Sequence, residues 1–143
     1  MTFLLVYYES STIWCLTVNN QIIITKVGVK NMDQFHNAGY KGLYNGETAD
    51  DIFKRKKLRY REEILDNMGS SELAANLFRI AQAEEKLINE KIQSEIEAKN
   101  AHYEVGKNVR EAIAKNSGTM PEKLPTPKKS LKELEAREKN DLK

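Results

Sequence analysis

The sequence contains too little cysteine and histidine for disulfide or most metal chemistry. Cys15 is the single cysteine among 143 residues, and His36 and His102 are the only histidines. One cysteine excludes a disulfide within the chain, and these three side chains do not have the spacing of metal ligands. No serine stands in a nucleophile motif, nor does Cys15, and we expect His102 to be a packed or solvated helix residue. We therefore predict no enzyme activity, no metal and no cofactor.

The chain also lacks a long hydrophobic run and a strong net charge. Its apolar start, residues 1–8, has no basic segment before it and is too short for a signal peptide or a membrane span, so we expect a cytoplasmic protein without a membrane partner. The net charge is +2, so any nucleic-acid signal must be local. Apolar residues make up 40% and charged residues 31%, which favours a helical protein with long solvated faces over a thick-cored enzyme.

Proline is rare, and all of it lies in residues 121–127. No proline therefore interrupts a helix from about Ser71 to Asn116, which would be roughly 70 Å long as one helix. That length indicates a coiled coil, with a homo-oligomer formed through the helix, or a helical hairpin. Glu84 and Lys91 interrupt the apolar stripe, so we predict two packing segments joined by a charged helical middle.

The composition changes sharply near residue 26. Residues 3–8, 12–18 and 21–25 are β-branched and aromatic and predict strands, with a hairpin turn at Asn19-Asn20. We predict three parts: a strand-like or disordered segment (1–26), a helical domain containing the long helix (27–117), and a proline-containing linker with a short charged helix (118–143). The fold class is mainly α, with short helices packed on a long helix.

Capping residues place the shorter helices. Thr48 and Asp51 predict a helix start, and that helix runs to about Lys57. A second short helix is predicted over 61–68, with Gly69 at its C-terminal cap. This helix pair is expected to pack on the start of the long helix, through Leu73, Leu77 and Ile80. Ser130 and Glu133 form a capping box for the terminal helix, and Gly118 fits a helix stop.

The most distinctive segment is FHNAGYKGLYNG, residues 35–46. Its glycines, at 39, 42 and 46, predict tight turns but match no phosphate-binding loop. One interpretation is that Tyr40 and Tyr44 pack a small helical core. The alternative is that the segment forms a recognition surface, because each tyrosine offers a flat apolar face and a polar tip.

A basic run follows this segment, and acidic residues at 47, 50 and 51 precede it. Part of the pattern is the ordinary complement to a helix dipole. A second interpretation is a patch that contacts phosphates, with neighbouring tyrosines, including Tyr60, stacking on bases; a third is a surface for an acidic protein. We predict that the run faces solvent as the contact to DNA or a nucleoprotein. The candidate contact residues are Lys54, Arg55, Lys56, Lys57, Arg59, Arg61, Tyr40 and Tyr44.

Four blocks of the sequence carry a family resemblance. They are GVKNMDQFHNAGYKGLYNG at 28–46, MGSSELAANLFRIAQAEEKL at 68–87, HYEVGKNVREAI at 102–113 and GTMPEKLPTPKKS at 118–130. In this order they resemble the C-terminal part of DNA-damage-inducible protein D, a bacterial family. The resemblance implies a cytoplasmic SOS-response protein without known catalytic activity, which acts on recombination or repair through DNA or recombinase–DNA filaments. It supplies no site residues and no small-molecule substrate.

The resemblance also sets out the alternatives. Members of the family carry an N-terminal domain similar to phage antirepressors, and we expect this chain to lack it. Residues 1–26 do not match the family, and their composition favours out-of-frame sequence ahead of a truncated gene over a different start. The alternative function is a phage-type antirepressor-like regulator that acts by protein–protein contact. An unrecognised enzyme would need converging polar groups, for which the sequence offers no candidates.

Overall fold

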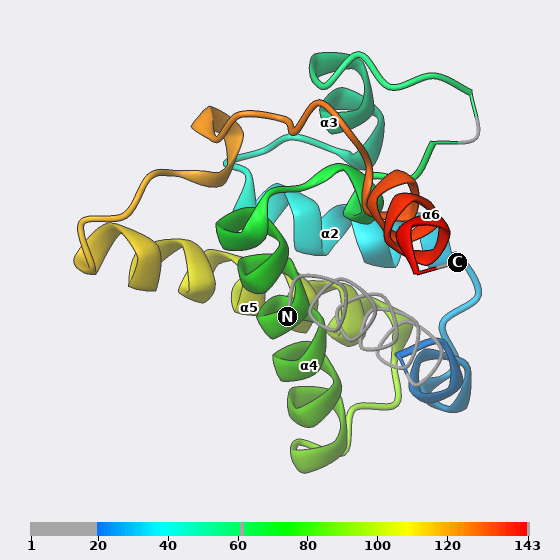
Figure 1. Cartoon of the computed structure of the whole chain (residues 1–143). Coiled ribbons are helices and arrows are strands. Elements are labelled where there is room, and N and C mark those ends of the chain that lie inside the picture. Colours follow the sequence, from blue (N-terminus) through cyan, green and yellow to red (C-terminus); the bar gives the residue numbers. More distant parts are fainter. Residues whose placement is uncertain (1–19, 61, 143) are drawn as a thin grey trace.

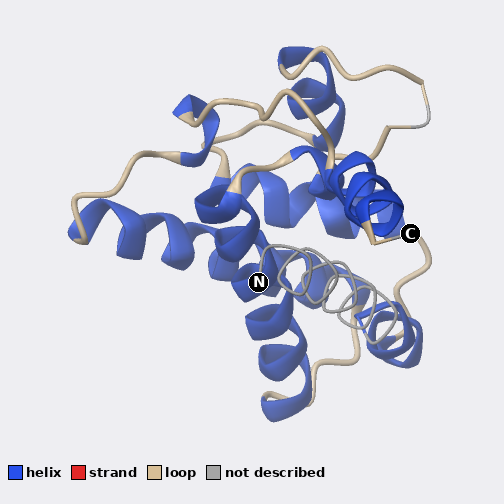
Figure 2. Ribbon diagram, viewed as in Figure 1, coloured by secondary structure: helices blue, strands red, loops and turns tan. Residues whose placement is uncertain are grey.

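The computed structural model describes residues 20–60 and 62–142, and this part of the chain is helical (Figures 1 and 2). It contains no strand within those ranges, which confirms the prediction of a mainly α fold. Short 3-10 turns lie at Leu65–Asn67 and Pro121–Lys123. The helices are α2 (Met32–Leu43), α3 (Ala49–Arg55), α4 (Ser70–Asn89), α5 (Glu95–Lys115) and α6 (Leu131–Asp141).

Residues 20–27 are helical, so the strand predicted over 21–25 is wrong. The reason is packing: Ile24 is fully buried and shares an apolar cluster with Phe35 and Leu87. Such contacts outweigh the strand preference of consecutive β-branched residues, which is itself largely a packing preference. The strands predicted over 3–8 and 12–18, and residue 19 of the predicted turn, lie outside the described residues.

The helix α2 continues through the glycine-tyrosine segment, so tight turns at Gly39 and Gly42 are a wrong prediction. Of the three glycines in the segment, only Gly46 takes a positive φ, of 101°, and it follows Asn45, with a φ of 55°, in the turn after the helix. The two helical glycines face α5. A Cβ on Gly42 would lie 2.3 Å from the Tyr103 carbonyl oxygen, and one on Gly106 would lie 2.5 Å from the Gly39 carbonyl oxygen. The missing side chains let the two helix backbones touch.

The two helices α2 and α5 run side by side in the same direction. Near their starts, Lys99 Nζ donates to Gln34 Oε1 at 3.0 Å. Near their ends, Arg110 Nη1 donates to the Leu43 carbonyl oxygen at 3.0 Å. Contacts at both ends fix the direction and the register of the pair.

The predicted long helix is two helices. It leaves helical geometry after Asn89, Lys91 takes a φ of 50°, and Ser94 Oγ caps α5 by accepting from the Glu97 N–H. The hairpin alternative is therefore correct, and both the charged helical middle and the coiled coil through one continuous helix are wrong. The turn is stabilised by Ile92, whose N–H donates to the Leu87 carbonyl oxygen and whose side chain packs on the Leu87 cluster.

The caps of the shorter helices agree with the sequence. Thr48 and Asp51 form a reciprocal capping box at α3. At α6, Ser130 Oγ accepts from the Glu133 N–H, which is the Ser130 half of the predicted capping box. The helix predicted over 61–68 is reduced to the turn at Leu65–Asn67 within the described residues. Gly69 is not a C-terminal cap: it is the N-cap of α4. Of the helices in residues 20–60 and 62–142, none has the length and apolar composition that a membrane crossing requires.

The interior is divided into two apolar clusters. One lies where α3 meets the ends of α2 and α5, and it includes Leu73, as predicted, with Leu77 packed against it. The other lies near residues 24–35 and the α4–α5 turn. Buried polar residues separate the two clusters on each helix: Asn76 and Arg79 on α4, and His102 on α5. The first cluster comprises Tyr40, Leu43, Tyr44, Ile52, Met68, Leu73, Val105 and Val109.

Candidate functional site

The predicted basic run lies on α3 and the loop after it, and most of its cations already have carboxylate partners. Lys57 is the exception among the described residues of the run, and Arg61 lies outside the described ranges. A cation that is paired with a carboxylate gains less from a phosphate than a free one does. The pairs, with their N–O distances, are Lys54–Asp50 at 2.8 Å, Arg55–Glu47 at 2.9 Å, Lys56–Glu72 at 2.8 Å and Arg59–Glu62 at 2.6 Å.

Lys56 is buried, so the prediction that the whole run faces solvent is wrong at this residue. The side chains of Lys56 and Glu72 are both 0% exposed. Lys56 Nζ also donates to the Asn67 carbonyl oxygen at 3.2 Å and to Thr126 Oγ1 at 3.3 Å. The carboxylate of Glu72 is buried in the first turn of α4, and a buried carboxylate requires a cation beside it. Lys56 supplies that cation and so cannot contact a phosphate in solution.

Tyr40 and Tyr44 are packing residues, as the first interpretation of the glycine-tyrosine segment predicts. They are 9% and 1% exposed. The Tyr44 hydroxyl donates to Glu72 Oε2 and accepts from Asn76 Nδ2 at 3.0 Å. Burial, with the negative charge of Glu72, raises the pKa of Tyr44. Neither ring is available to stack on a base, whereas Tyr60 is 88% exposed.

A polar pair between α4 and α5 lies behind these tyrosines. The His102 imidazole is 1% exposed, so it is a packed residue. Its Nδ1 lies 2.8 Å from the Phe35 carbonyl oxygen, and its Nε2 lies 2.6 Å from Arg79 Nη1. The carbonyl can only accept and the guanidinium can only donate, so Nδ1 carries the proton. Burial and then the charge of Arg79 hold the pKa of His102 well below its ordinary value, and the ring is neutral.

Arg79 is the residue that the sequence-based predictions missed. It is 2% exposed and forms no ion pair in the described part of the chain. It also donates to Asn76 Oδ1 at 3.1 Å and contacts the Tyr40 hydroxyl, and its guanidinium carbon lies 4.6 Å from the Tyr40 ring centroid. The sequence could have revealed it through helical spacing, because Arg79 lies on the same buried side of α4 as Asn76, Ala83 and Leu87.

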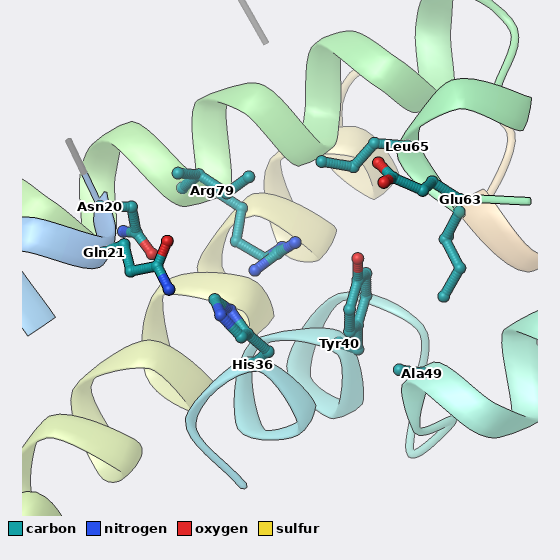
Figure 3. A pocket seen from close by; sticks show the side chains of 10 residues that line it. Asn20, Gln21, His36, Tyr40, Ala49, Glu63, Leu65 and Arg79 are labelled. Carbon is teal, nitrogen blue, oxygen red and sulfur yellow. The ribbon is translucent and has the colours of Figure 1, made fainter. Parts of the chain in front are cut away.

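A hollow of about 330 Å³ lies over Arg79 (Figure 3). The guanidinium extends from α4 into the space between His36 and the Tyr40 hydroxyl. Burial, followed by the charge of Arg79, lowers the pKa of His36. Glu63, an exposed residue, stands on the far side of the hollow from the histidine. The hollow therefore joins a buried cation to solvent.

A second surface lies on the outer side of α2 and α5, where two hollows of about 420 and 470 Å³ share Lys41 and Tyr103. We name it the lysine–tyrosine face: Lys41, Lys99, Tyr103 and Lys107. The α5 members are spaced by four residues and so lie on one side of that helix. Tyr103 is 47% exposed. Within the described residues none of the three lysines is ion-paired, and Lys99 bonds only the Gln34 amide.

Sequence-based prediction missed this face because its lysines are spread over 67 positions of the chain, from 41 to 107. The only local signal was the spacing of Lys99, Tyr103 and Lys107 on a predicted helix. The face is not purely basic, since Glu111 lines one hollow. In the described residues no cluster of three or more histidine, cysteine, aspartate or glutamate side chains could hold a metal ion.

Comparison with known proteins gives two matches. Residues 18–134 match the family model of the DinD C-terminal domain, so the prediction that residues 1–26 lie outside the family is wrong for residues 18–26. Over 101 residues the chain is 52% identical to DNA damage-inducible protein D of Escherichia coli strain K12, and the match covers 71% of this chain and 37% of that protein. The chain thus spans little more than a third of the length of that relative. No solved structure matches the chain.

Proposed function

Because the chain belongs to the DinD C-terminal domain family, we propose that it is a non-enzymatic accessory protein of the bacterial DNA-damage response that acts by contacting DNA or a recombinase–DNA filament. The role in the DNA-damage response rests on the 52% identity, over 101 residues, to a DNA damage-inducible protein. The contact with DNA or a recombinase–DNA filament rests on the protein surface, which must supply cations to phosphates and flat rings to bases.

The lysine–tyrosine face meets these requirements better than the basic run. Lys41 and Lys107 have no carboxylate partner in the described part of the chain and are exposed, so a phosphate would meet free cations. Tyr103 stands between them with about half of its surface open, and a base can stack on its ring. Lys54 and Arg59, in contrast, must each leave a carboxylate before they bind a phosphate. We therefore assign the contact to this face.

Two matched charge reversals test the assignment. Lys41→Glu/Lys107→Glu alters the lysine–tyrosine face, and Lys54→Glu/Lys57→Glu makes the same change in charge on the basic run. Binding of a labelled single-stranded oligonucleotide, alone and coated with recombinase, is measured by fluorescence anisotropy over a series of salt concentrations. We expect the first variant to bind at least tenfold more weakly and to reduce the salt slope by about 1.4, for two lost phosphate contacts at about 0.7 each. The second should stay within about threefold of the parent chain.

The aromatic part of the face is tested separately. Tyr103→Ala should weaken single-strand binding by about 1–3 kcal/mol, the usual value of one stacked base. Tyr60→Ala, an exposed tyrosine beside the basic run, is the control. Loss of binding in the Lys54→Glu/Lys57→Glu variant alone would move the contact to the basic run. Absence of binding to both DNA and the filament would contradict the proposed function.

One observation favours the alternative of an antirepressor-like regulator that acts by protein contact. Large apolar side chains are exposed on α4 and α5, with Phe78 at 53%, Ile88 at 58% and Ile96 at 68%. Such residues anchor protein partners and contribute nothing to phosphate binding. A partner held by them would bind with little dependence on salt, which separates this alternative from a nucleic-acid contact.

A further inference from the structure

We propose that the hollow over Arg79 binds a carboxylate, supplied by an acidic side chain in a peptide segment of a partner protein. The site lies apart from the lysine–tyrosine face: His36 and Tyr40 project from α2 toward α4, whereas Lys41 lies on the outer side of the helix. The proposal therefore stands whether or not the chain binds DNA.

The first ground is an uncompensated charge. Arg79 is 98% removed from solvent, yet its polar contacts, to His102, Asn76 and the Tyr40 hydroxyl, are all with neutral groups. The buried carboxylate on the same helix, Glu72, is occupied by Lys56 and Tyr44. A buried cation without an anion is costly, and proteins normally pair such a charge. The aromatic face of Tyr40 and the polar partners offset part of that cost, and an incoming anion would offset much of the rest.

The second ground is geometry. Arg79 Nε has no hydrogen-bond partner among the described residues, although the atom is buried. A buried donor left unpaired in a native protein calls for an explanation. Figure 3 shows the guanidinium directed into the hollow, with Tyr40 on one side and His36 on the other. Ile64, Leu65 and Ile80 also line the space, and they provide apolar contacts for the methylene groups that carry a carboxylate.

The charges around the hollow favour a monoanion on a slender arm. Among the described residues Arg79 is the one buried cation that lines it, and the lowered pKa of His36 leaves that ring neutral near pH 7. Glu63, an exposed residue that also lines the hollow, adds a negative charge, which opposes a dianion such as phosphate. A nucleic-acid backbone is too bulky to reach a guanidinium that is 2% exposed. An aspartate or glutamate side chain fits each condition, and its two oxygens match the fork of an arginine.

Nuclear magnetic resonance of the full chain tests the proposal, with the Arg79 Nε–H signal as the reporter. The probes are N-acetylglutamate amide, its neutral isostere N-acetylglutamine amide, and inorganic phosphate. We expect a saturable shift with the carboxylate, and binding at least tenfold weaker for the isostere and for phosphate. The carboxylate should also raise the pKa of the His36 imidazole, because it places a negative charge beside the ring.

Two variants sharpen the test. Glu63→Gln removes the negative charge that lines the hollow and should tighten carboxylate binding about two- to fivefold, the range for a single exposed charge. Glu85→Gln, on the exposed side of α4, is the matched control and should leave the affinity unchanged. Arg79→Gln should abolish binding, and Glu63→Gln keeps the test decisive if Arg79→Gln does not fold.

Three results would overturn the proposal. Equal shifts with the neutral isostere would show that charge is not recognised. Phosphate binding as tight as carboxylate binding would show that the hollow binds a phosphate group and not an acidic side chain. A lower melting temperature of Glu63→Gln with no gain in carboxylate affinity would identify Glu63 itself as the partner of Arg79.

Discussion

The close approach of α2 and α5 predicts that Gly42→Ala is destabilising. An added Cβ would lie 2.3 Å from the Tyr103 carbonyl oxygen and 2.8 Å from the Lys107 amide nitrogen, whereas ordinary contact begins at 3.4 Å. Both neighbours are backbone atoms of α5, so no side chain can rotate away. The helices must therefore separate locally by about 1 Å to admit the methyl group.

Two opposing terms decide the size of the effect. Replacing a glycine by alanine favours a helix by up to about 1 kcal/mol, the value for a helix interior, and Gly42 lies in the last turn of α2. Forcing a methyl group into a packed contact costs about 1–3 kcal/mol, and a rigid backbone neighbour places this case near the upper value. The net loss in the free energy of unfolding is about 2 kcal/mol. For a chain of this length that lowers the melting temperature by about 4–8 °C.

Urea and thermal unfolding, followed by circular dichroism, measure this loss. Asn108→Ala is the control, because it adds alanine to an exposed position of α5 where only helix propensity acts. That variant should gain up to about 0.7 kcal/mol. If Gly42→Ala gains stability as Asn108→Ala does, then the two helices do not pack at the distance described, and the role given to the glycines is wrong.

Two further predictions concern buried charge. Lys56→Met leaves the Glu72 carboxylate buried without its cation and should lower the free energy of unfolding in urea by about 3–5 kcal/mol. The control is Lys57→Met at the neighbouring exposed residue, which should change it by no more than about 0.5 kcal/mol. Equal losses in the two variants would contradict the buried pair. Burial lowers the pKa of His102 in the folded chain well below 6.5, the ordinary value that applies to the unfolded chain. As the pH falls below 6.5, the unfolded chain therefore binds a proton that the folded chain does not. Stability is then complete above about pH 6.5 and falls as the pH decreases toward the folded pKa, by up to about 1.4 kcal/mol per pH unit, and His36 acts in the same direction. A free energy of unfolding that stays constant from about pH 7.5 to 5.5 would show that His102 is not buried in its neutral form.

The elements that the sequence predicted correctly are those set by neighbours in the chain. The caps at Thr48 and Ser130 each join a side-chain oxygen to an N–H three residues ahead, so the pattern is visible without any tertiary contact. The helical pattern over residues 71–116, with an apolar segment at each end, was also recognisable, because apolar stripes are local. The break after Asn89 was not, since it depends on the packing of Ile92 against residues of another helix.

The elements that failed depend on distant partners. Lys56 belongs to a basic run by sequence, and only the arrival of Glu72 from α4 makes it a core residue. The candidate site was missed for the same reason: Arg79 acquires its environment from α2 and α5, and the lysines of the lysine–tyrosine face come together only when those helices pack. Sequence patterns along one helix cannot contain that information.

The glycine-tyrosine segment shows how one local pattern can serve several distant contacts. A Cβ on Gly39 would lie 2.3 Å from His102 Nε2 and 2.6 Å from Arg79 Nη1, so the missing side chain is what leaves room for that pair. Tyr40, the next residue, places its ring against the same guanidinium. The close packing of α2 on α5 and the buried arginine are therefore not independent features. A side chain added at Gly39 would displace both His102 and Arg79. The contact between α2 and α5 and the proposed carboxylate site therefore require the same glycine.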